Sequence, residues 1–159
     1  MRIDRFRVGL SNLDELAERV RAIYALKNVA VVGMSKDPSK DSHEVGLYLK
    51  SIGFNVYPIN PTTPEIEGMK SYASLLDLPE DIKSTLDIVD VFRRSEDIPP
   101  IVDQALQLHR TYSRPRVFWM QLGIENEDSA QKLRSAGIQV FQDICMMATH
   151  RLLKRTGRL

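Results

Sequence analysis

The sequence predicts an α/β fold in which helices cover both faces of a five-stranded parallel sheet. Five short apolar runs, rich in β-branched residues, alternate with segments whose apolar residues repeat at helical spacing. The segments between the runs are long enough to hold the crossovers that parallel neighbours require. Together these observations predict a Rossmann-like three-layer sandwich with strand order 3-2-1-4-5 and one extra helix at the N-terminus.

The N-terminal half is expected to contain two helices and two strands. Ser11, with Asp14 three residues on, resembles a capping box at the start of a leading helix. The run NVAVVG at 28–33 predicts the first strand. Apolar residues at helical spacing then predict a helix over 45–52, closed by a glycine, and FNVYPIN at 54–60 predicts the second strand.

The C-terminal half is expected to supply three further strands. The stretch 61–85 contains three prolines and predicts a long connection with one helical turn near 74–77. The apolar runs at 86–92, 116–120 and 138–142 predict strands three, four and five. The intervening helices are expected to follow Ser95, to run from Asn126 to Ala136, and to cover 145–155.

The overall composition limits the class of protein. The 159 residues are expected to form one domain over 1–159, with a leading helix in 1–28 and the core in 29–153. A formal net charge of +1 gives no reason to expect a nucleic-acid partner. The absence of a long apolar run gives no reason to expect a membrane partner. A single cysteine and a start without a signal-peptide pattern favour a cytoplasmic location.

The loop after the first strand is the strongest candidate for an anion site. Gly33 permits close backbone approach, Ser35 offers a hydroxyl, and Lys36 and Lys40 add charge ahead of a helix N-terminus. The alternative is an ordinary turn with solvated lysines. Only one glycine lies in the turn, and Asn60 stands where a NAD-binding domain usually places an acid, so the nicotinamide interpretation is weakened.

Two other strand ends carry candidate binding residues. Arg93 and Arg94 follow strand three, where guanidinium groups can bind phosphate, and Phe92 can form a flat wall for a base. The alternative is that Phe92 lies in the core while the arginines pair with Glu96 or Asp97. Gln121, just beyond strand four, can face the cleft.

The sequence predicts no catalytic residues and no metal site. The three histidines are far apart in the chain, and only His43 lies near the loop. Cys145 opens the last predicted helix and is either a small buried residue or a reactive thiol. The sequence contains no cluster of soft ligands suited to zinc.

Several segments together resemble the stand-alone CoA-binding proteins, which are similar to the N-terminal domain of the succinyl-CoA synthetase alpha subunit. They include VAVVGMSKDPSK, GLYLKSIGFNVYPINP, DIVDVFRRSEDIP and VFWMQLGIENEDSAQKLRSAGIQV, and the resemblance covers about 29–153. It implies a Rossmann-like fold that binds coenzyme A at the strand carboxyl ends. The ligand set that it implies is Gly33, Met34, Ser35, Lys36, Lys40, Asn60, Pro61, Phe92, Arg93 and Gln121.

The sequence departs from the family pattern at Met34, where a small residue is common. Its side chain is expected either to line the pocket or to turn into the core. The expected function is binding of CoA or acyl-CoA without independent catalysis, with a protein partner possible. One alternative is a CoA-ligase component that acts with a separate subunit, and another is a NAD(P)-binding regulator or oxidoreductase.

Overall fold

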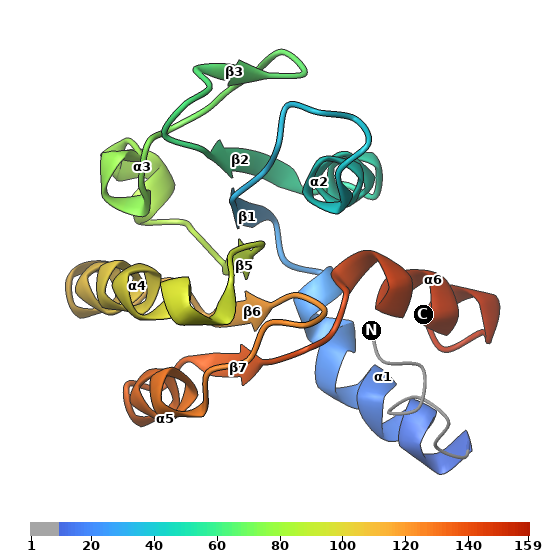
Figure 1. Ribbon diagram of the computed structural model, residues 1–159. Helices are drawn as coiled ribbons and strands as arrows, with labels where there is room; N and C mark the ends of the chain where they lie inside the picture. Colours follow the sequence, from blue (N-terminus) through green and yellow to red (C-terminus); the bar gives the residue numbers. More distant parts are fainter. Residues whose placement is uncertain (1–9) are drawn as a thin grey trace.

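A computed structural model describes residues 10–159 and has the predicted α/β architecture (Figure 1). Five parallel strands form the sheet: β1 (Asn28–Val32), β2 (Asn55–Ile59), β5 (Ile88–Val91), β6 (Val117–Met120) and β7 (Gln139–Phe141). The helices are α1 (Leu10–Tyr24), α2 (Asp41–Ser51), α3 (Glu80–Lys83), α4 (Ile98–Tyr112), α5 (Glu127–Ser135) and α6 (Met146–Arg155). The side chain of Ser11, on which the predicted capping box depends, lies outside the described part of the chain.

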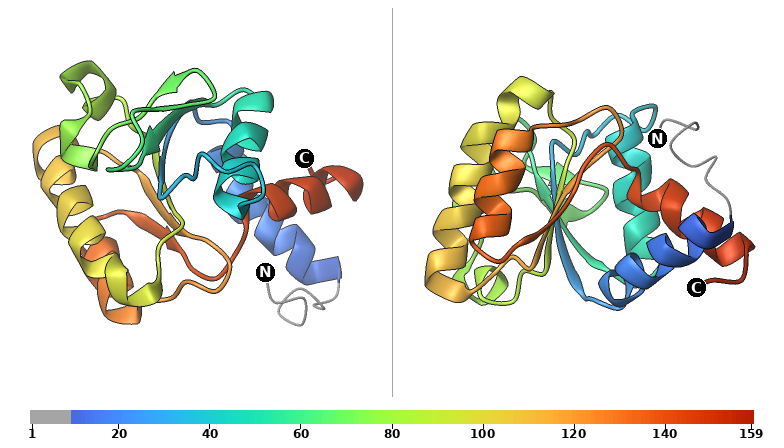
Figure 2. Two further views of the ribbon diagram at one scale, coloured as in Figure 1. Left: turned by 45° about the horizontal axis from the view of Figure 1, so that its top comes forward. Right: turned by 90° about the horizontal axis from the view of Figure 1, so that it is seen from below.

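The helices cover both faces of the sheet, as a three-layer sandwich requires. In Figure 2, α4 and α5 lie on one face, and α1, α2 and α6 lie on the other. Each face has its own buried apolar cluster. Phe118 and Leu133 belong to the cluster beneath α4 and α5, while Trp119 and Leu49 belong to the cluster beneath α1, α2 and α6. No helix within residues 10–159 has the length and apolar character needed to cross a membrane.

The order of the strands differs from the predicted 3-2-1-4-5. The observed order is β2-β1-β5-β6-β7, so the third strand of the main sheet lies beside the first, which gives 2-1-3-4-5. This order is also Rossmann-like and binds ligands at the same kind of switch point. Pro58 explains the difference, because a proline cannot donate to a ladder on both sides and is confined to edge strands. In the observed order β2 is an edge strand, and every residue of β5 is buried.

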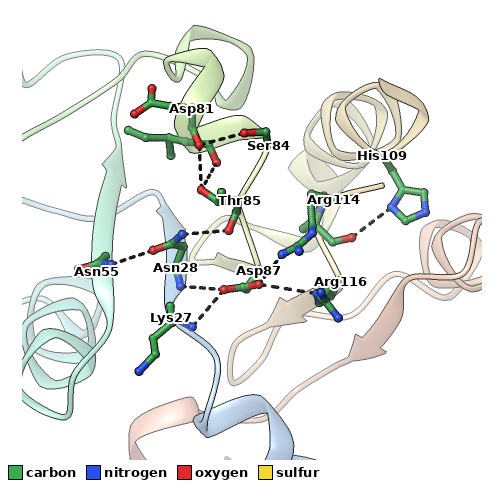
Figure 3. Close-up of polar contacts among 12 residues, drawn as sticks. Lys27, Asn28, Asn55, Asp81, Ser84, Thr85, Asp87, His109, Arg114 and Arg116 are labelled. Atoms are coloured by element: carbon green, nitrogen blue, oxygen red, sulfur yellow. Dashed lines mark hydrogen bonds and ion pairs between the residues drawn. The ribbon is translucent and has the colours of Figure 1, made fainter. Parts of the chain in front are cut away.

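A polar network at the amino-terminal ends of the strands holds β1 beside β5 (Figure 3). Asp87, directly before β5, accepts hydrogen bonds at 3.0 Å from the backbone N–H groups of Lys27 and Asn28. Its other carboxylate oxygen accepts from Arg114 Nη1 at 2.7 Å. One carboxylate therefore links the starts of β1 and β5 to the segment that leads into β6.

The connection between β2 and β5 contains a hairpin that the sequence did not predict. β3 (Glu65–Ile66) and β4 (Met69–Lys70) pair antiparallel, and the turn between them has positive φ at Glu67 and Gly68. Ile66 is 2% exposed and anchors the hairpin to the core. The predicted helical turn near 74–77 is present as the 3-10 helix η2 (Leu75–Asp77).

Candidate functional site

The candidate site lies at the carboxyl edge of the sheet, where β1 and β5 are neighbours and the chain leaves them in different directions. Backbone hydrogen bonds hold the strand ends in register. Gly33 N donates to Ile59 O at 2.9 Å, and Phe92 N donates to Val32 O at 2.8 Å. The loops after β1, β2, β5 and β6 therefore meet at a topological switch point, where open α/β sheets bind ligands.

Gly33 is required by the protein backbone itself. Its φ is +84°, and a Cβ at this position would lie 2.5 Å from Phe92 O. The Arg93 side chain also passes close by, with Cδ 3.4 Å from the same point. The absence of a side chain therefore lets the loop after β1 cross the end of β5, a different close approach from the predicted contact with a phosphate.

The loop after β1 is organised around the start of α2. Ser35 N donates to Ser42 Oγ at 2.9 Å, and Asp37 N donates to Ser35 Oγ at 3.0 Å. Lys36 and Lys40 are exposed, and neither forms an ion pair with residues 10–159. The N–H groups of His43 and Glu44 donate to Lys40 O at 3.1 and 3.2 Å, which leaves those of Asp41 and Ser42 without an acceptor in the described residues. This end of α2 therefore combines two amide donors with two lysine charges.

The side chain of Met34 turns into the core. Met34 is fully buried and packs against α2, where its Sδ would lie 2.7 Å from a Cβ at Gly46. Of the two predicted orientations, the structure has the inward one. Only the backbone of Met34 can contribute to the site.

Asn60 ties the loops after β1 and β2 together. Its Nδ2 donates to Met34 O at 3.0 Å, and its Oδ1 accepts from both N and Oγ1 of Thr62 at 2.9 Å. The amide of Asn60 is therefore engaged within the protein, and its role here is to position the loop. Pro61 follows it on the exposed surface.

The two arginines after β5 have different surroundings. Arg94 forms ion pairs with Asp97 at 3.1 Å and Glu96 at 3.5 Å, which raise its pKa. Arg93 is exposed near the loop after β1 and forms no ion pair with the described residues. The expected alternative, in which the arginines pair with Glu96 or Asp97, thus applies to Arg94. Arg93 keeps an uncompensated charge beside Gly33.

A pocket of about 380 Å³ opens next to these charges, between the ends of β5 and β6 and the starts of α2 and α6. Phe92, Gln121 and Cys145 contribute to its wall, so two of the predicted ligand residues and the lone cysteine share one cavity. The remaining lining residues were not predicted from the sequence: Asp41, Val45, Leu122, Met147 and Ala148. Leu122 is 46% exposed, although large apolar side chains are mostly covered elsewhere in the described chain.

Cys145 is the N-cap of α6, where Ala148 N donates to its Sγ at 3.4 Å. Burial raises the pKa of the thiol, and the backbone hydrogen bonds to it oppose that shift in part. The thiol is only partly buried and stands on the pocket wall.

Asp90 is a buried carboxyl group that bonds to the pocket residue Gln121, and it was not predicted from the sequence as a site residue. It lies fully buried within β5, and its Oδ1 accepts from Gln121 Nε2 at 2.5 Å. Burial raises its pKa to about 7, and the bond from Gln121 opposes the shift. The sequence did hold a signal for this residue, namely a single acid inside the apolar run IVDVF. A buried charge in a central strand is costly, so an acid there suggests a specific role.

His43 has a structural role beside the loop. Its Nδ1 lies 2.8 Å from Ser35 O, and its Nε2 lies 3.0 Å from Glu67 of the β3–β4 turn. The ring therefore joins the loop after β1 to the hairpin. Across residues 10–159 no group of three or more histidine, cysteine or acidic side chains is arranged to hold a metal ion.

A larger cavity of about 710 Å³ lies at the opposite, amino-terminal edge of the sheet. Arg114 and Arg116 line it, and both are directed to Asp87 in the network of Figure 3. It includes none of the predicted site residues. The carboxyl edge is therefore the better candidate.

Comparison with known proteins identifies the family of this chain. The family model described as a CoA binding domain matches residues 27–151. The uncharacterised protein YneT of Bacillus subtilis is 36% identical over 138 residues, which cover 87% of this chain and 96% of YneT. A solved structure from Thermus thermophilus is 37% identical with a TM-score of 0.77, and the match covers 86% of this chain and 98% of that one.

A further match is to an enzyme. The ADP-forming acetate–CoA ligase of Methanocaldococcus jannaschii is 40% identical over 63 residues, which cover 40% of this chain but only 9% of the ligase. The shared part is therefore a small portion of that protein. Because the family model spans most of the chain, the chain belongs to the CoA-binding domain family.

Proposed function

We propose that this protein binds coenzyme A or an acyl-CoA at the carboxyl ends of β1, β5 and β6, without catalysis of its own. The observation that carries the proposal is the pairing of two unlike surfaces. Lys36, Lys40 and Arg93 are exposed cations on the loops after β1 and β5, without ion-pair partners in residues 10–159, and a mostly apolar pocket opens at the same edge of the sheet.

This arrangement fits the chemistry of CoA. One end of CoA carries a pyrophosphate and a 3′-phosphate, which suit the lysines, Arg93 and the N–H groups of Asp41 and Ser42 at the start of α2. The other end is a slender pantetheine arm with amides and a thiol, which suits a mostly apolar pocket with a few polar groups. Phe92 borders the pocket between these two surfaces.

The geometry argues against a NAD-type ligand. The position after β2 has an amide where an acid would bind the ribose hydroxyls, and Asn60 already uses that amide on Met34 and Thr62. The three cations Lys36, Lys40 and Arg93 also carry more positive charge than is needed to bind a pyrophosphate alone.

Calorimetric titration of CoA, dephospho-CoA and NAD tests the proposal. We expect affinity to fall in that order, with a roughly tenfold to hundredfold loss on removing the 3′-phosphate, because a charge-assisted contact contributes about 1.5–3 kcal/mol. NAD binding as tightly as CoA would contradict the proposal. Mass analysis of small molecules released from the denatured protein provides an independent check.

A second candidate is a CoA-binding component that works with a separate ligase partner. The exposed Leu122 beside the pocket favours it, as does the match to a short part of an acetate–CoA ligase. A partner that is required for acyl-CoA formation, with this protein supplying the CoA site, would establish that candidate.

A further inference from the structure

The hydrogen-bonded pair of Asp90 and Gln121 is not needed to hold the strands together. Asp90 is fully buried between Val31 of β1 and Trp119 of β6. Its Oδ2 has no hydrogen-bond partner in residues 10–159, and no cation there pairs with it. A buried carboxyl group that satisfies only one of its oxygens is costly to the fold.

Gln121 connects this buried acid to the pocket. It is 2% exposed, follows β6 directly, and contributes to the pocket wall. Its backbone N–H donates to Val91 O at 3.2 Å, which fixes the residue beside the end of β5. Its Nε2 donates to Asp90, whereas its Oε1 has no hydrogen-bond partner within residues 10–159.

The two ends of a carboxamide have opposite hydrogen-bonding character. An ionised carboxylate only accepts hydrogen bonds, so it holds the NH₂ end and leaves the carbonyl oxygen available. A protonated carboxyl group can instead donate to the carbonyl oxygen, which turns the NH₂ end outward. The protonation state of the acid therefore decides which end of the amide is available.

We propose that Asp90 is a positioning residue that orients Gln121, so that Gln121 Oε1 accepts a hydrogen bond from an N–H group of the pantetheine arm only while Asp90 is ionised. This inference rests on the proposed function, and it adds a selectivity device to the same site. Ligands with a donor in the pocket bind the ionised form, and protonation of Asp90 weakens them.

Other titratable side chains lie near Asp90 or on the pocket wall, and the test must separate them from it. Tyr24 of α1 and Cys145 ahead of α6 face it, and burial raises the pKa of both. His150 lies against Tyr24, and burial lowers its pKa below the ordinary value. Asp41 is on the α2 wall of the pocket. Comparison with Asp90→Asn removes the contribution of these four groups.

The first test requires no ligand. The side-chain ¹H–¹⁵N signals of Gln121, identified by their loss in Gln121→Leu, are followed from pH 5.5 to 8.5. We expect a titration with a midpoint near 7 that is absent in Asp90→Asn. Signals that do not move, or that move equally in Asp90→Asn, would overturn the inference.

The second test uses dephospho-CoA, which lacks the 3′-phosphate that itself titrates near pH 6. If only the ionised form binds, a midpoint near 7 gives an affinity loss of about thirtyfold between pH 8.5 and 5.5. We expect less than a threefold change in Asp90→Asn and Gln121→Leu. A flat wild-type profile, or a full loss in the variants, would overturn the inference.

Failure of the proposed function gives a different result. If neither CoA nor dephospho-CoA binds at any pH, both proposals are overturned, even if the ligand-free signals titrate. If CoA binds but its affinity does not follow Asp90, only the inference is overturned. Should Asp90→Asn fail to fold, Gln121→Leu decides the matter, because persistence of the pH dependence without the amide overturns the inference.

Discussion

Arg93 and Arg94 are adjacent in the chain but have different electrostatic surroundings. Arg94 is held by Asp97 and Glu96, so its charge is already compensated. Arg93 has no such partner among the described residues and lies near Gly33, at the switch point of the sheet. Sequence alone does not separate them, because both follow the same strand and both have acids within four positions.

This difference predicts unequal effects of two matched substitutions. Arg93→Ala should weaken CoA binding by roughly tenfold to a hundredfold, since it removes a charge-assisted phosphate contact. Arg94→Ala should change it by less than about threefold, because exposed ion pairs contribute little. Calorimetry measures both, and thermal unfolding controls for folding. Equal losses in the two variants would remove Arg93 from the site.

Cys145 should form a mixed disulfide with oxidised CoA near neutral pH. Its thiolate attacks one sulfur of the CoA disulfide, one CoA thiol leaves, and the protein gains one CoA. The pocket should favour oxidised CoA over oxidised glutathione at equal concentration, although the raised pKa slows both reactions. Intact-protein mass spectrometry measures the adduct, with Cys145→Ser as the control. Equal rates for the two disulfides would show that the pocket does not direct the reaction.

At the scale of the element, Gly33 controls how β1 ends against β5. Gly33→Ala should lower the free energy of unfolding by about 3 kcal/mol or more, because it combines left-handed backbone strain with a contact to Phe92 O. Gly68→Ala is the matched control. Gly68 has a φ of +76°, but a Cβ there meets nothing within 4 Å, so we expect a cost of about 1 kcal/mol. Urea denaturation measures both, and similar losses would contradict the close-approach argument.

Most elements could be predicted from local patterns, because their causes are local. The α5 cap is an example, since Asn126 Oδ1 accepts from Ser129 N at 3.0 Å as the sequence indicates. The strand order could not be read from periodicity, which does not specify neighbours. Pro58 was the residue that indicated the order, because a proline within a strand favours an edge position. The β3–β4 hairpin escaped prediction because its strands have two residues each, too few to show alternation.

At the scale of the whole molecule, the sequence predicts a site at the carboxyl edge of the sheet, but it does not assign the role of each side chain. Motif positions indicate which residues come near one another, whereas side-chain direction depends on packing. Met34 is turned inward by the space that Gly46 leaves, and Asn60 is occupied by Met34 and Thr62. Two of the predicted ligand-binding residues therefore stabilise the loop instead. The bond between the buried Asp90 and Gln121 is seen only in the folded structure.

Asp90 also predicts how the stability of the whole fold depends on pH. Its pKa is about 7 in the folded protein and near 4 when unfolded, so between these values the folded state holds more protons. Stability should therefore fall as the pH rises, by about 2.5 kcal/mol between pH 5 and pH 7.5, and level off above that.

Urea denaturation of the ligand-free protein across this pH range measures the effect, and Asp90→Asn is the matched control because it removes the proton exchange while keeping the shape of the side chain. The difference in unfolding free energy between wild type and variant should shift by that same amount in favour of the variant as the pH rises. A constant difference across the range would mean that Asp90 keeps one protonation state throughout. In that case Gln121 would present the same end of its amide to the pocket at every pH tested.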